Sequence, residues 1–238
     1  MLLLGYDIGS SAIKASLIEI SSGKKLASAG SPDGELDIHS PKKGWAEQHP
    51  ETWWKHLKLA TGLLLEKVNP EVEQIEAIGI SYQMHGLVMV DRYHNVLRPS
   101  IIWCDGRAVE IGAAAFKDLG EEYCLQKLMN SPGNFTASKL KWVKEHEPEI
   151  FAKIHKVMLP GDYIAMRMSG GLTTTQSGLS EGILWDYPKG SLAEEVLEYF
   201  GIPDRMIPTI LPNFGSQGEL SAAAAEDLGL KKGISLTY

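Results

Sequence analysis

Hydrophobic positions near the amino terminus follow a pattern that predicts strands. Residues 2–8 form a nearly continuous apolar run, typical of a strand covered on both faces, and residues 13–20 form a second apolar-rich segment with partial alternation. A turn at 21–23 leads to a further strand at 24–29, so the three segments predict an antiparallel meander. A long polar loop at 31–50 follows.

The spacing of apolar residues changes to a helical one at Glu51. Pro50 precedes Trp53, Trp54, Leu57 and Leu64, which recur at helical intervals. Two more strands are predicted at 75–82 and 87–90, and the polar tip at 91–95 is expected to close a hairpin.

The rest of the chain is predicted to be mainly helical, with one strand at 156–159. The predicted helices span 108–119, 137–145, 163–168, 193–200 and 222–228. A meander followed by alternating helices and strands predicts an α/β fold with one main sheet, and the sequence has no internal repeat or low-complexity segment.

Composition narrows the class of protein. A chain of 238 residues with 44% hydrophobic content can bury a substantial core, as one large domain or two small ones. The net charge of -7, without blocks of like charge, argues against binding to nucleic acid or to an anionic membrane. Cys104 and Cys124 lack metal-ligand and Cys-x-x-Cys spacing, which favours a reducing compartment and plain packing. With no secretory leader and no apolar stretch of roughly 20 residues, we expect a cytoplasmic location.

The first candidate for chemistry is the turn between the first two predicted strands. Gly9 permits close approach, the hydroxyls of Ser10 and Ser11 can donate to phosphate oxygens, and Lys14 adds positive charge. Asp7, at the strand end, can hold a hydrated Mg²⁺ because magnesium keeps several waters and takes few carboxylates. The alternative is an ordinary hairpin turn, which favours the same residue types.

A second candidate is formed by two later segments, "SYQMHG" at 81–86 and "RPSIIWCDGR" at 98–107. Their side chains suit polyol recognition, since Gln83 and His85 donate and accept, Asp105 accepts twice, and Trp103 offers an apolar wall. The alternatives are a turn histidine, a core tryptophan, and an Asp105–Arg107 pair that caps a helix.

Taken together, these motifs resemble the FGGY carbohydrate kinases, members of the actin, Hsp70 and hexokinase superfamily, and most closely the xylulose kinases among them. The similar segments are "DIGSSAIK", "GWAEQHPETWW", "IGISYQMHG", "LRPSIIWCDGR", "FTASKLKWVKEHEPEIF" and "KVMLPGDYIAMRMSG", in the family's order and spacing. The resemblance runs from Leu2 to about Gly233.

The resemblance implies a ribonuclease-H-like, actin-like domain whose mixed five-stranded sheet, three strands antiparallel and two parallel, is flanked by helices. Residues 1–238 would form the sugar-binding N-terminal domain, and ATP would lie mainly on a C-terminal domain absent from this chain. Asp7 would handle Mg²⁺, and Gly9, Ser10 and Ser11 would lie near the transferred phosphate. The sugar pocket would be lined by Met84, His85, Trp103 and Asp105, with Gln83 beside them.

Three departures from the family accompany the resemblance. The family's catalytic aspartate follows a strand similar to residues 233–238, so the base is expected beyond Tyr238 and this fragment alone is predicted to be inactive. Gly161 stands where related xylulose kinases tend to have Lys, which suggests a surface difference. Thr175 lies near a position that often carries Asp, which puts the local hydrogen bonds and the sugar identity in doubt.

The complete enzyme is therefore expected to transfer the γ-phosphoryl group of ATP, with Mg²⁺, to a terminal hydroxyl of a ketopentose such as D-xylulose. A kinase for another sugar or polyol and a non-catalytic sugar-binding or actin-like module are the alternatives. An isolated first domain is expected to expose an apolar face that favours self-association, so a homodimer is a further hypothesis.

Overall fold

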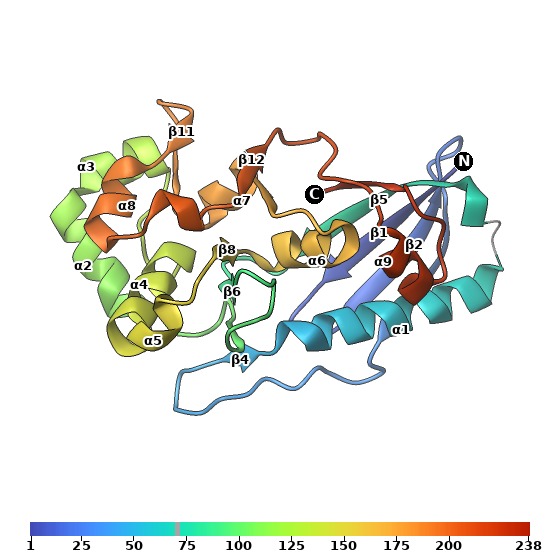
Figure 1. Ribbon diagram of the computed structural model, residues 1–238, viewed down its shortest axis with the longest axis horizontal. Coiled ribbons are helices and arrows are strands. Elements are labelled where there is room, and N and C mark those ends of the chain that lie inside the picture. Colours follow the sequence, from blue (N-terminus) through green and yellow to red (C-terminus); the bar gives the residue numbers. More distant parts are fainter. Residues whose placement is uncertain (70–71) are drawn as a thin grey trace.

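The computed structural model describes residues 1–69 and 72–238, which form a sheet-based part and a helical part, each with its own hydrophobic core (Figure 1). The sheet packs against α1 (Pro50–Val68), α6 (Pro160–Ser169) and α9 (Ala222–Leu228). The helical part contains α2 (Val109–Leu119), α3 (Glu121–Tyr123), α4 (Thr136–His146), α5 (Pro148–Phe151) and α8 (Glu194–Phe200). The predicted α/β class is confirmed.

The main sheet has five strands in the order β13-β5-β1-β2-β3. They are β1 (Leu2–Ile8), β2 (Ile13–Glu19), β3 (Lys25–Ser31), β5 (Ile75–Tyr82) and β13 (Ser235–Thr237). The first three are antiparallel neighbours, whereas β5 pairs parallel with both β1 and β13. The mixed five-stranded sheet implied by the family resemblance is therefore present.

One face of this sheet carries the core and the other is partly open. Along β1, Leu4 and Ile8 are completely buried, whereas Leu3, on the opposite face, is 37% exposed. The expectation that residues 2–8 are covered on both faces is therefore wrong for this structure. Because Leu3 and Gly5 are themselves nonpolar, the sequence did not reveal which positions face outward.

Helix α1 packs along the covered face (Figure 1), and its residues Trp53, Leu57 and Leu64 are buried. Its first turn contains Pro50, whose fixed φ suits that position, and the side chain of His49 accepts a hydrogen bond from the Glu51 amide at 3.3 Å. The helix predicted from Glu51 is thus confirmed within one residue.

The predicted hairpin after residue 87 is only partly formed. Strand β6 (Val88–Val90) pairs with β8 (Lys156–Met158), and the tip at 91–95 closes a single bridge between Val90 and Val96. These pairings lead the chain from the sheet toward the helical part.

The structure contains short elements that the hydrophobic pattern did not predict. The short strands are β4 (Glu47–Gln48), β7 (Ser100–Ile101), β9 (Thr173–Thr175), β10 (Trp185–Asp186), β11 (Ser191–Leu192) and β12 (Thr209–Leu211). The short helices are α7 (Gln176–Glu181), the π-helix Cys124–Leu128 and the 3₁₀ helices Val72–Gln74 and Asp204–Met206. Strand β4 lies inside the segment predicted as a polar loop.

The two cysteines are both free but differ in their surroundings. Cys124 is completely buried in the helical core, as plain packing predicts, whereas Cys104 is exposed, so that expectation is wrong for Cys104. Within residues 1–69 and 72–238, none of the helices is both long and apolar enough to cross a membrane.

Candidate functional site

The turn that joins β1 to β2 is tight and depends on glycine. The Gly9 amide donates to the carbonyl oxygen of Ala12 at 3.1 Å, and a Cβ atom at Gly9 would lie 2.8 Å from that oxygen. The Gly9 amide is therefore already paired, so any donation to phosphate would come from Ser10 and Ser11, which are half-buried and exposed, respectively.

Asp7 lies on the partly open face of the sheet, just before this turn. Its carboxylate is 3.7 Å from the ammonium of Lys14, its antiparallel neighbour on β2, and the two side chains are 50% and 65% exposed. The carboxylate is thus accessible, as water-mediated binding of Mg²⁺ requires. Among the described residues, no group of three or more His, Cys, Asp or Glu side chains could hold a metal, so such an ion would rely mainly on water, carbonyl and substrate oxygens.

The structure brings the turn into contact with both later motifs. The Gln83 amide donates to the Ile8 carbonyl at 2.9 Å, and the Trp103 indole donates to the Ser10 hydroxyl at 3.1 Å. The two segments named as candidates for polyol recognition therefore meet the segment named for phosphate binding at the carboxyl ends of β1 and β5.

Gln48 joins these groups, although its place in "GWAEQHPETWW" did not mark it as a site residue. Its amide donates to the Ser10 carbonyl at 2.7 Å, and its amide oxygen accepts from the Trp53 indole at 3.0 Å. The Gln83 side-chain amide lies 3.5 Å from the same oxygen. Gln48 thus fixes the turn against the first residues of α1.

Four residues line a small hollow beside the turn: Tyr82, Gln83, Met84 and Trp103. The hollow has a volume of about 220 Å³, and Met84 and Trp103 are about half exposed. Tyr82 was not identified from the sequence as a site residue, although it lies in the quoted motif.

His85 faces a neighbouring hollow of about 210 Å³, which it shares with Phe135 and Glu181. Its ring packs edge-on against Phe135, and its Nδ1 lies 3.3 Å from a Glu181 oxygen. The His85 side chain holds the pKa of Glu181 below its usual range. Met84 and His85 therefore line separate hollows in this structure.

Asp105 does not face either hollow. It is completely buried, and its two carboxylate oxygens accept hydrogen bonds from Arg107 and from the Ala46 amide. A sugar hydroxyl would have to displace these donors to reach it. Of the two interpretations of Asp105 from the sequence, the structure shows the ion pair with Arg107.

The structure explains the two positions inside the chain that depart from the family pattern, Thr175 and Gly161. Thr175 is the N-cap of α7, where its hydroxyl accepts from the Gly178 amide at 3.1 Å. Gly161 is buried, so the expectation of a surface difference is wrong. A Cβ atom at Gly161 would lie 2.1 Å from the Tyr82 ring, so the missing side chain makes room for that ring.

We therefore expect Gly161→Ala to destabilise the protein by about 1–3 kcal/mol, because the added methyl group overpacks the contact with Tyr82. The free energy of unfolding from urea titrations measures this. In the Tyr82→Ala background the same substitution should become neutral or stabilising, because the ring is gone and alanine favours a helix over glycine. Gly62→Ala in α1 is the control, since a Cβ there meets no atom within 4 Å. Equal effects of the two glycine substitutions would contradict the overpacking.

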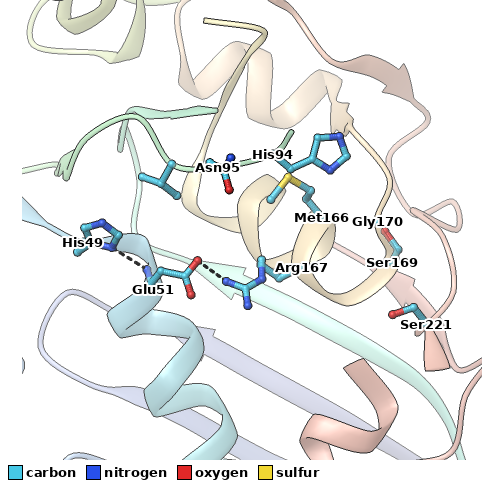
Figure 2. Close-up of a pocket in the computed structure, with 10 residues that line it drawn as sticks. His49, Glu51, His94, Asn95, Met166, Arg167, Ser169, Gly170 and Ser221 are labelled. Carbon is cyan, nitrogen blue, oxygen red and sulfur yellow. Dashed lines mark hydrogen bonds and ion pairs between the residues drawn. The ribbon is translucent and has the colours of Figure 1, made fainter. Parts of the chain in front are cut away.

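A larger cavity, of about 570 Å³, lies at the amino terminus of α1 and is lined by none of the predicted site residues (Figure 2). Its polar groups include His49, Glu51, His94 and Arg167. Arg167 is already bonded to Glu51 and to the Tyr163 hydroxyl, which leaves this cavity without an unpaired charge that would select a ligand.

Comparison with known proteins identifies the family of the chain. Residues 2–237 match the N-terminal domain of the FGGY family of carbohydrate kinases. The chain is 32% identical to the xylulose kinase of Escherichia coli (strain K12) over 228 residues, covering 95% of this chain and 46% of that protein. The xylulose kinase of Lactococcus lactis is 31% identical, with 94% of this chain and 44% of that protein covered.

Solved structures of carbohydrate kinases also match this chain. The crystal structure of a "xyloylose kinase" from Brucella ovis superimposes with a TM-score of 0.89 at 32% identity, covering 100% of this chain and 48% of that one. The xylulose kinase of Rhodospirillum rubrum gives a TM-score of 0.90 at 27% identity, with the same coverage. The chain thus spans about half the length of the relatives that it matches.

Proposed function

The chain belongs to the FGGY family of carbohydrate kinases, and on this premise we propose that it is the sugar-binding domain of an ATP-dependent kinase that phosphorylates a ketopentose, D-xylulose first among them, at a terminal hydroxyl. The observation that carries the proposal is the direct contact between the Gly9–Ser11 turn and the Trp103 side chain. Through it, a phosphate-binding turn and an apolar wall for a sugar share one edge of the sheet.

Each group of residues has a distinct role in the proposal. Trp103 and Met84 pack against the carbon face of the sugar and Gln83 bonds its hydroxyls in the hollow beside the turn, while His85 bonds a hydroxyl from the neighbouring hollow. Ser10 and Ser11 donate to the phosphate, and Lys14 adds positive charge beside them. Asp105 is left out of the sugar contacts, because it is buried and already paired.

Phosphoryl transfer depends on positioning the reactants and on neutralising the developing charge. Asp7 would hold Mg²⁺ through water at this edge of the sheet, and the bound ion supplies charge neutralisation at the phosphate. We assign the general base and most of the ATP contacts to a further domain of a longer protein, in line with relatives twice the length of this chain.

Calorimetric titration of the 238-residue chain with D-xylulose, D-ribulose, gluconate and glycerol tests the sugar-binding role. We expect a ketopentose to bind most tightly and Trp103→Ala to weaken it about tenfold, because the indole supplies much of the apolar contact. Phe214→Ala is the control, since that ring is 98% exposed and lines neither hollow, and it should leave the affinity unchanged. If none of the four compounds binds, or if Trp103→Ala has no effect, the proposal is wrong.

A further inference from the structure

His85 has an unusual backbone conformation. Its φ is 57°, in the left-handed region that a residue other than glycine rarely occupies. The next residue, Gly86, is packed so closely that a Cβ atom there would lie 2.6 Å from the Pro160 ring at the start of α6. Such a conformation persists only where the surroundings determine it.

Two charged side chains from the helical part contact His85, one at its carbonyl oxygen and the other at its amide and ring. The ammonium of Lys139, on α4, donates to the His85 carbonyl oxygen at 2.9 Å. A Glu181 oxygen, at the end of α7, accepts from the His85 amide at 3.3 Å and lies 3.3 Å from the ring Nδ1. A cation thus meets the carbonyl of this residue, and an anion meets its amide and its ring.

The ammonium of Lys139 is buried at a cost in hydration. The residue is 0% exposed, and a buried ammonium is costly unless its partners compensate for lost hydration. The groups that face it are Asp105, Arg107 and Cys104, besides the His85 carbonyl. Burial lowers the pKa of Lys139 to about 8, although Asp105 opposes this shift.

We propose that Lys139 and Glu181 are positioning residues that fix His85 in its left-handed conformation and thereby aim its imidazole at the sugar. This inference rests on the proposed sugar-binding function. A carboxylate beside Nδ1 favours a proton on that nitrogen, which leaves Nε2 as an acceptor for a sugar hydroxyl. The two charges therefore set both the direction and the hydrogen-bonding role of the ring.

Lys139→Met and Glu181→Ala each remove one of the two contacts, and the first readout needs no ligand. We expect the His85 amide to exchange its hydrogen at least about tenfold faster in either variant, and the backbone resonances of residues 83–86 to shift, since a hydrogen bond to a charged group is lost. Lys141→Met is the matched control, because Lys141 lies on the same helix but pairs with Glu145 at the surface. Unchanged exchange and resonances in both variants would overturn the inference.

The second readout is the affinity for D-xylulose, which should fall about tenfold in Lys139→Met and Glu181→Ala but not in Lys141→Met. Glu181→Gln, which keeps an oxygen for the His85 amide, should restore part of the affinity lost in Glu181→Ala. Wild-type affinity should also fall as the pH rises through about 8, where Lys139 loses its charge, whereas Lys139→Met should lack this step.

The two readouts separate this inference from the proposed function. If the wild-type chain binds no sugar but the loop still loosens in both variants, the proposed function fails and the positioning role stands. If sugar binds normally to Lys139→Met, with no change in pH dependence, the positioning role fails and the sugar-binding function stands.

Discussion

Replacing Arg107 with alanine is expected to lower the free energy of unfolding by about 3–5 kcal/mol, because the substitution leaves a buried carboxylate without its counterion. The Arg107 side chain is 0% exposed, and its guanidinium bonds Asp105 at 2.6 Å and lies 2.7 Å from Glu47. Asp105 is itself completely buried, so bulk water does not reach it in the wild-type structure.

The cluster around Arg107 joins segments that are far apart in the sequence. Glu47 also pairs with Arg98, which in turn bonds Glu147 at 2.9 Å beyond the end of α4. The guanidinium of Arg107 lies 3.8 Å from the ring centre of Trp45 and 4.8 Å from that of Trp142. Removing Arg107 therefore loses stacking and hydrogen bonds together.

Urea unfolding of wild type and Arg107→Ala measures the loss, and Arg92→Ala serves as the control because Arg92 is exposed. The control should stay within about 0.5 kcal/mol of wild type. Adding Asp105→Asn to Arg107→Ala should recover part of the stability, because the unpaired charge is then removed. A loss below about 1 kcal/mol for Arg107→Ala would show that water or another cation compensates Asp105.

Long elements with a strong local pattern were predictable from the sequence. The strands at 2–8 and 75–82 and the helix at 222–228 agree with the structure residue for residue. The two-residue strands β4 and β7 were not predictable, because they exist only through pairing with each other across the chain. Their own sequences carry too few residues for a period to show.

The candidate site was predictable where short sequence motifs, rather than the periodicity of hydrophobic residues, indicated it. The motifs placed the Gly9–Ser11 turn and Trp103 in one site, and the structure brings them into contact. Lys139 was missed because it resembles its neighbours Lys141 and Lys144 on α4, and nothing in the sequence shows which of the three is buried. The sequence left Asp105 open between a sugar ligand and a partner of Arg107, because its pairing depends on the tertiary fold.

Asp7→Ala is expected to lower the turnover of the proposed longer kinase at least about a hundredfold while leaving sugar binding intact, because Asp7 would position the charge that neutralises the transferred phosphate. The sugar contacts assigned above come from Trp103, Met84, Gln83 and His85, and none of them bonds Asp7. The substitution therefore separates binding from chemistry. A coupled assay for ADP formation gives kcat, and calorimetry gives the affinity for the sugar.

A loss of folding stability cannot produce a hundredfold fall in turnover, because the substitution of Asp7 should cost little folding free energy. Asp7 is half exposed and its pair with Lys14 spans 3.7 Å, so breaking it should cost less than about 1 kcal/mol. Asp33→Asn provides the control, since Asp33 is exposed and lies outside the site, and it should retain wild-type kcat. Asp7→Asn keeps the size of the side chain but removes its charge, so it should lose turnover like Asp7→Ala. Normal turnover in either Asp7 variant would remove this carboxylate from the mechanism and leave the turn as a structural hairpin.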